Sequence, residues 1–163
     1  MRTKKLTSLA LVSALALMLS YVEFLLPPIY AAVPGIKVGL PNIVILFVLY
    51  KYGVKEAAAV SGVRMLLSTL FFGNPVMLIY SLAGAALSLA FMCLFKRINL
   101  FSEVGVSIIG GVMHNLGQIL VAMVLLETAE IAYYMLVLAI SGTLAGVFIG
   151  IAGALLMKQF NKC

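Results

Sequence analysis

The feature that most constrains the fold is a series of apolar stretches separated by short breaks rich in glycine, proline or charge. The first covers residues 6–26, and about 20 apolar residues suffice for a helix to cross a hydrocarbon core of roughly 30 Å. Only 10% of the 163 residues are charged, whereas a soluble domain carries roughly a quarter. We therefore expect an all-α integral membrane protein, with residues 1–163 forming a single transmembrane domain.

The breaks divide the chain into six predicted helices. Their expected bounds are about 6–26, 40–51, 54–72, 76–95, 104–126 and 131–157. The second stretch is short for a membrane span, and the longest connection precedes it. The expected architecture is a bundle of six transmembrane helices.

The basic residues predict the orientation of the bundle. When the loops are taken alternately, nine of the eleven Lys and Arg residues fall on one side and only Lys37 on the other, while Arg64 lies inside the third helix. Excess positive charge marks the cytoplasmic side, so both chain ends are expected inside a bacterial cytoplasmic membrane. Omitting the short second helix would place Lys96 and Arg97 outside. The same loop residues account for the net charge of +6 without a nucleic acid partner.

A polar cluster on the fifth helix is the first candidate binding site, because polar groups deep in hydrocarbon are costly unless paired. Spacings of three and four residues place His114 and Gln118 on one face, with Asn115 close by. We expect these side chains to face the bundle interior. They either bind a polar ligand or hold the fifth helix in register through interhelical hydrogen bonds.

Arg64 is the second candidate, and it lies roughly 12 Å below the outer end of its helix. It either pairs with Glu23 near the outer end of the first helix or, with Lys37 from the loop above, receives an anionic group. Asn42 and Asn74, at the outer ends of the second and third helices, either line the mouth of the same cavity or act as ordinary caps.

Small residues recur every four positions on two helices, a spacing that lets helices approach closely. Gly142, Gly146 and Gly150 on the sixth helix are expected to pack within the bundle. Ala10 and Ala14 on the first helix either pack in the same way or present a flat face to another protein.

Catalysis is not expected from this chain. The sequence has no phosphate-binding loop, no metal-spaced cluster, no nucleophile beside a base and no aspartate, and its five acidic residues are all glutamates. Carboxylates for holding magnesium are therefore scarce. We expect no cofactor and no metal, and we expect Cys93 and Cys163 to be free thiols.

Two motifs, GIKVGLPN at residues 35–42 and HNLGQ at residues 114–118, resemble those of the bacterial membrane family called Gx transporters. The family is also labelled heptaprenyl diphosphate synthase component I, and the resemblance covers nearly the whole chain, with Arg64 and Asn74 matching further polar positions. The family is similar to the S-components of energy-coupling-factor vitamin transporters. Their first helix carries an Ala-x-x-x-Ala motif, which Ala10 and Ala14 fit.

The resemblance implies a substrate-binding membrane subunit of an uptake transporter of the energy-coupling-factor type, capturing a small polar or anionic ligand from the outer side. Arg64, His114, Asn115 and Gln118 would bind the ligand and Lys37 would close over it. A transmembrane coupling subunit and ATPases would be the partners. The alternative is a membrane partner of a heptaprenyl or polyprenyl diphosphate synthase in isoprenoid quinone biosynthesis, non-catalytic by itself. A third possibility is a purely structural scaffold.

Overall fold

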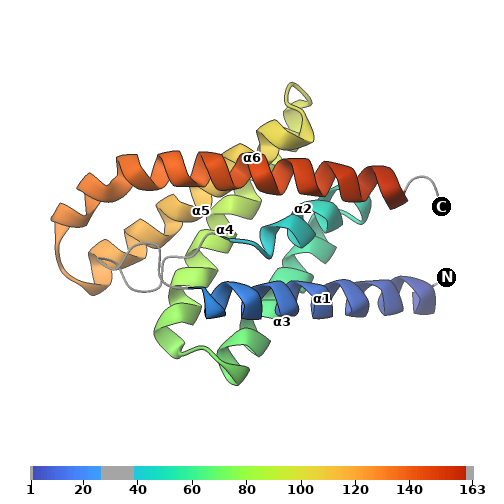
Figure 1. The fold of residues 1–163 in the computed structure, drawn as a ribbon, viewed down its shortest axis with the longest axis horizontal. Helices are drawn as coiled ribbons and strands as arrows, with labels where there is room; N and C mark the ends of the chain where they lie inside the picture. The colour runs from blue at the N-terminus through green and yellow to red at the C-terminus, as the bar shows by residue number, and fades with distance from the viewer. Residues whose placement is uncertain (1, 27–38, 161–163) are drawn as a thin grey trace.

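The structure, a computed structural model, describes residues 2–26 and 39–160, which form helices joined by short turns and loops (Figure 1). In chain order the elements are α1 (Arg2–Leu25), α2 (Asn42–Lys51), α3 (Val54–Phe71), α4 (Pro75–Ile98), α5 (Glu103–Leu125), the 3-10 helix η1 (Ala129–Tyr134) and α6 (Met135–Phe160). These two ranges contain no strand, so the all-α prediction is confirmed.

All six predicted helices are present, with bounds that differ from the predicted ones by a few residues. The differences are largest at the starts of the first and last helices. Helix α1 already begins at Arg2, and at the other end the chain first forms η1 and becomes α-helical only at Met135. Cys93 is a free cysteine on α4, as expected. Lys37 and Cys163 lie outside the described residues.

Local sequence signals set the ends of α4 and α5. Asn74 caps α4 by accepting a hydrogen bond from the Met77 backbone N–H at 2.8 Å, and Pro75 occupies the first helical position. The helix ends at Asn99, which adopts the left-handed conformation with φ 59°. Ser102 then caps α5 through the Gly105 N–H at 3.3 Å.

The prediction of six spans is not confirmed. Among the described residues, four helical segments are long and apolar enough to cross a membrane: Thr3–Leu25, Pro75–Ile98, Glu103–Leu125 and Ala129–Gln159. The 10 residues of α2 extend only about 15 Å, half the hydrocarbon thickness. The 18 residues of α3 include Lys55, Glu56 and Arg64. The molecule is thus a helical bundle of the membrane type, in which α2 is shorter and α3 more charged than the four long apolar segments.

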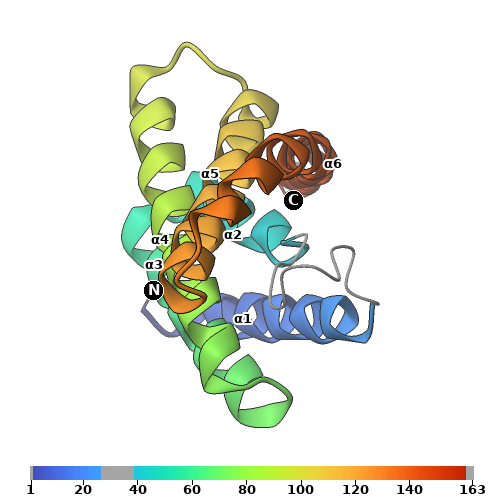
Figure 2. The same cartoon turned by 90° about the vertical axis from the view of Figure 1, so that its left-hand side faces the viewer.

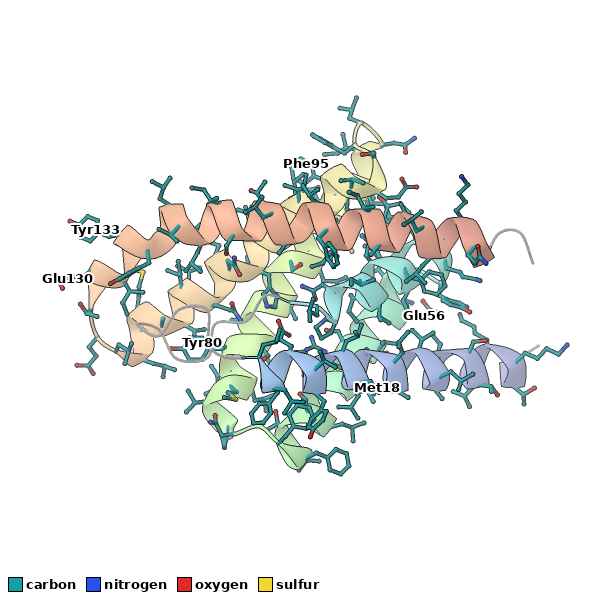
Figure 3. All side chains as sticks on the ribbon, in the orientation of Figure 1. Met18, Glu56, Tyr80, Phe95, Glu130 and Tyr133 are labelled. Carbon is teal, nitrogen blue, oxygen red and sulfur yellow. The ribbon has the colours of Figure 1, made fainter. Side chains whose placement is uncertain are left out.

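The first turn of α1 and the last turn of α6 lie at the same end of the molecule (Figure 1). Glu56 lies toward that end, whereas Glu130 and Tyr133 lie at the opposite end (Figure 3). This placement agrees with chain ends on one side of a membrane. Which side faces the cytoplasm stays a prediction.

Helices α4, α5 and α6 pack in chain order, with α5 between the other two (Figure 2). Glycines allow the close approach of α5 and α6. A Cβ atom built on Gly146 would lie 2.5 Å from the Ile108 Cα atom, and one on Gly150 would lie 2.7 Å from the Val104 Cα atom. The predicted packing role of the α6 glycines is therefore confirmed.

The short helix α2 fills the centre of the bundle. It contacts α1, α3 and α6, and its residues from Val44 to Leu49 are all buried. Leu46 and Leu49 have no exposed surface. Because α2 is surrounded by other helices, its residues form most of the larger hydrophobic core.

Candidate functional site

Four buried polar side chains in the bundle have polar atoms without a hydrogen-bond partner among the described residues. We call them the interior polar cluster: Arg64 on α3, Ser88 on α4, and His114 and Gln118 on α5. Their exposed fractions are 6%, 2%, 5% and 1%, respectively. The unpartnered atoms are Arg64 Nε, Ser88 Oγ, His114 Nδ1, and both Nε2 and Oε1 of Gln118. Such atoms are rare in folded proteins because burying them is costly.

Helical spacing and glycines bring the members of the cluster together. His114 and Gln118 are four residues apart on α5, so they share a face, as predicted. On α4, a Cβ atom at Gly84 would lie 3.0 Å from His114 Nδ1, so this glycine makes room for the imidazole. Ser88 lies one turn further along α4, where a Cβ at Gly110 of α5 would be 3.2 Å from its hydroxyl oxygen.

Arg64 connects the cluster to α1. Its Nη1 donates to Ser20 Oγ at 3.4 Å, a long hydrogen bond, while Nε has no partner in the described part of the chain. Arg64 also interacts electrostatically with Glu23 of α1 and with His114 of α5. The guanidinium group therefore lies between α1 and α5 with unused hydrogen-bonding capacity.

Glu23 is held at the start of the α2 region. Its carboxylate accepts hydrogen bonds from the backbone N–H groups of Gly39 and of Leu40, the latter at 3.4 Å. Asn42 lies in the same place with 8% of its surface exposed, and a Cβ atom on Gly39, whose φ is +87°, would be 2.9 Å from the Asn42 Nδ2 atom. The GLPN part of the first motif thus adjoins the acidic residue that interacts with Arg64.

Asn115 contacts α6. Its Nδ2 atom donates to the Leu138 carbonyl of α6 at 2.8 Å and lies 3.4 Å from Ser141 Oγ. A Cβ atom built on Gly142 would meet the same Nδ2 atom at 2.9 Å. The structure therefore gives Asn115 the interhelical hydrogen bond that the sequence allowed, and it separates this residue from the cluster.

The other predicted site residues lie elsewhere. Asn74 is exposed and its side chain caps α4. Ala10 and Ala14 are exposed on α1, beside the exposed Leu11 and Leu15. This face of α1 is open to lipid or to another protein, which keeps both interpretations of the alanines possible.

Sequence reasoning missed Ser88 and Ser20. A serine in an apolar helix is common, because its hydroxyl can donate to a carbonyl of the preceding turn, as Ser20 does to Ala16 at 3.0 Å. Ser88 has no such bond among the described residues. In the sequence, the one sign that Ser88 lies near His114 is its spacing of four residues from Gly84, which places both on the same face of α4.

An apolar groove of about 440 Å³ lies on the other side of the α4–α5 contact from the cluster. Ala83 of α4 and Gly117 of α5 are among its lining residues, and a Cβ atom on Gly117 would be 2.6 Å from the Ala83 carbonyl oxygen. The backbones of the two helices thus separate the groove from His114. The described residues include no group of three His, Cys, Asp or Glu side chains that could hold a metal ion.

Comparison with known families identifies a relationship. The model of the family described as heptaprenyl diphosphate synthase component I matches residues 12–156. The matched region includes all of α2 to α5 and the larger part of α1 and α6. No curated protein and no solved structure matches the chain significantly.

Proposed function

Because this chain belongs to the heptaprenyl diphosphate synthase component I family, we propose that it is the non-catalytic membrane partner of a polyprenyl diphosphate synthase. The family match over residues 12–156 carries this proposal. The four long apolar helices support it, since they would hold the pair at a membrane. The likeness to S-components is not confirmed by any match, so transport becomes the second candidate.

The proposal divides the work between two proteins. Prenyl chain elongation that relies on Mg²⁺ needs carboxylate ligands, and we assign that chemistry to the partner. Membrane attachment is assigned to this chain. Each CH₂ group removed from water contributes about 0.8 kcal/mol, so a long isoprenoid is far more soluble in the bilayer. A synthase held at the membrane would release its product where that product dissolves.

The basic end of the bundle is the surface we assign to docking. Lys51, Lys55, Lys96 and Arg97 gather at the ends of α2, α3 and α4 that are predicted to face the cytoplasm. Lys96 Nζ donates to the Leu49 carbonyl at 2.7 Å and lies 4.6 Å from the Tyr50 ring centroid, which joins α4 to α2 here. An acidic surface on the synthase would be attracted to this end and oriented by it.

Co-purification from detergent tests the proposal. The tagged full chain should retain a soluble prenyl diphosphate synthase, and prenyl-transfer activity should move to the membrane fraction when both are expressed together. Charge reversal of Lys55 and Arg97 to Glu should weaken retention. A matched reversal of Lys158, at the end of α6, should weaken it less. Failure to retain the synthase would contradict the proposal.

The second candidate is the substrate-binding subunit of an uptake transporter, which two observations favour. The interior polar cluster has unused hydrogen-bonding groups, and Ala10 and Ala14 are exposed on α1. In that case ATPase and coupling subunits would co-purify, and Ala10→Leu with Ala14→Leu would abolish their recovery. Leu144→Phe, at an exposed position on α6, serves as the control. Recovery that survives both alanine changes would contradict this docking role.

Labelling tests the proposed bacterial inner-membrane orientation with both ends inside. Tyr133 is 85% exposed at the η1 end of the molecule. In a variant without native cysteines, Tyr133→Cys should react with an impermeant thiol reagent added to intact cells, whereas Lys55→Cys should react only after lysis. The reverse pattern would invert the orientation.

A further inference from the structure

The interior polar cluster has more hydrogen-bonding groups than the folded chain uses. Arg64, Ser88, His114 and Gln118 are each more than nine-tenths buried, yet five of their polar atoms have no partner among the described residues. Packing alone does not require such groups, because an apolar side chain would fill the same volume without the cost of burying a polar atom. A bound polar group would use them.

The chemistry of these atoms selects an oxyanion. Arg64 contributes a positive charge and a free Nε–H donor, Gln118 contributes an NH₂ group, and Ser88 contributes a hydroxyl. They come from three different helices, so donors would reach a bound group from several sides. A phosphoryl group has enough oxygens to accept from all of them, and a guanidinium group matches its geometry. The Gln118 Oε1 atom can accept from a protonated phosphoryl oxygen.

We propose that Arg64, Ser88, His114 and Gln118 form a buried binding site for a diphosphate group. The site itself is inferred from the unpartnered atoms. The expectation that the diphosphate arrives on an isoprenoid chain rests on the proposed function. Asn115 is excluded from the site, because its amide already donates to the Leu138 carbonyl of α6.

Thermal unfolding of the detergent-purified full chain tests the site with three probes: farnesyl diphosphate, inorganic diphosphate and farnesol. A ligand that binds the folded state raises the melting temperature in proportion to ln(1 + [L]/Kd). Farnesyl diphosphate should raise it in the wild type. Loss of a hydrogen bond to a charged group should weaken the apparent affinity about tenfold or more in Gln118→Leu and in Arg64→Lys.

Two further variants distinguish loss of ligand binding from misfolding of the variant protein. Ser88→Ala removes one donor with little change in volume, so it should fold normally and bind more weakly. Asn74→Ala removes an exposed helix cap outside the cluster, so it should lower the melting temperature but keep the full ligand shift. Without ligand, Gln118→Leu should melt at the same temperature as the wild type or higher, which a purely structural role for Gln118 would not produce.

Each outcome decides the matter. A larger shift with farnesyl diphosphate than with either inorganic diphosphate or farnesol supports the site with an isoprenoid ligand. Equal shifts with farnesyl diphosphate and inorganic diphosphate, both larger than with farnesol, support it with the free anion. Equal protection by farnesol, or no protection by any probe, overturns the site. Gln118→Leu should lose the ligand shift but still retain the soluble synthase. An absent ligand shift in a wild-type chain that still retains the synthase contradicts this inference alone, whereas a ligand shift without retention of the synthase contradicts the proposed function alone.

Discussion

Helix α5 carries polar side chains on two faces, and the two faces use these side chains differently. Asn115 faces α6, where its amide donates to a backbone carbonyl and glycines bring the two helices together. His114 and Gln118 face α3 and α4, and three of their polar atoms have no partner in the described chain. The α6 face uses its polar group for packing. The other face keeps its polar groups available, as expected of a binding site, where function is favoured over stability.

The largest expected effect is at the α5–α6 seam. Gly146→Ala would place a Cβ atom 2.5 Å from the Ile108 Cα atom, so the backbones must separate. The free energy of unfolding should fall by about 3 kcal/mol, the upper part of the range for overpacking. Unfolding of the purified protein measures this. Gly62→Ala is the control, because nothing lies within 4 Å of its new Cβ atom and the protein should be no less stable.

Removing the amide on the packing face should have a smaller effect. Asn115→Leu deletes the hydrogen bond to Leu138 and should lower the free energy of unfolding by about 1 kcal/mol, the typical contribution of one such bond. The same unfolding assay measures it. An unchanged stability would show that Asn115 does not hold α5 against α6.

The matching substitution on the other face should have the opposite sign. Gln118→Leu removes two buried polar atoms that make no hydrogen bond among the described residues, so stability without ligand should stay level or rise by up to about 1 kcal/mol. A loss equal to that of Asn115→Leu would abolish the distinction between the two faces.

The smallest effect is expected outside both faces, where Lys5 of α1 pairs with Glu56 of α3 at 2.5 Å. The hydrogen bond from Lys5 lowers the pKa of Glu56 below its ordinary value of 4.5. Because the pKa of Glu56 is lowered in the folded state, its carboxylate stabilises the fold at pH values above the ordinary pKa. This contribution is lost as the pH falls through the lowered pKa. Lys5→Ala should therefore flatten the decline in melting temperature from about pH 5 to about pH 3. High salt should reduce the difference.

The sequence predicted the helices well because apolar runs, basic ends and proline or glycine breaks all change at the same places. Asn74 and Pro75 mark the start of α4 in the sequence and in the structure. The sequence did not predict η1, because its AEIAYY residues continue the apolar pattern of α6 and only their hydrogen bonding differs. The charge pattern requires α2 and α3 to carry the chain across the membrane and back, but the 10 residues of α2 are short for a span, so the six-span topology stays a prediction.

The site was only partly predictable. Helical spacing was sufficient to place His114 and Gln118 on one face. It did not reveal that Asn115, one residue further along and thus rotated by about 100° on the helix, meets α6 instead of the cluster. Contacts between helices, such as Arg64 near His114, depend on crossing positions that no single helix encodes. Ser88 acquires its importance from the absence of a partner among the described residues, which only the packed bundle reveals.

The contact between α2 and α6 also has a consequence for how the protein is made. Leu46 of α2 packs so closely on α6 that a Cβ atom at Gly153 would be 2.8 Å from its side chain. About a hundred residues separate these partners in the chain, and the ribosome makes α6 after α1 to α5. The central helix α2 therefore lacks one of its covering surfaces until α6 has been made. A nascent chain lacking α6 would be a natural substrate for membrane chaperones or proteases.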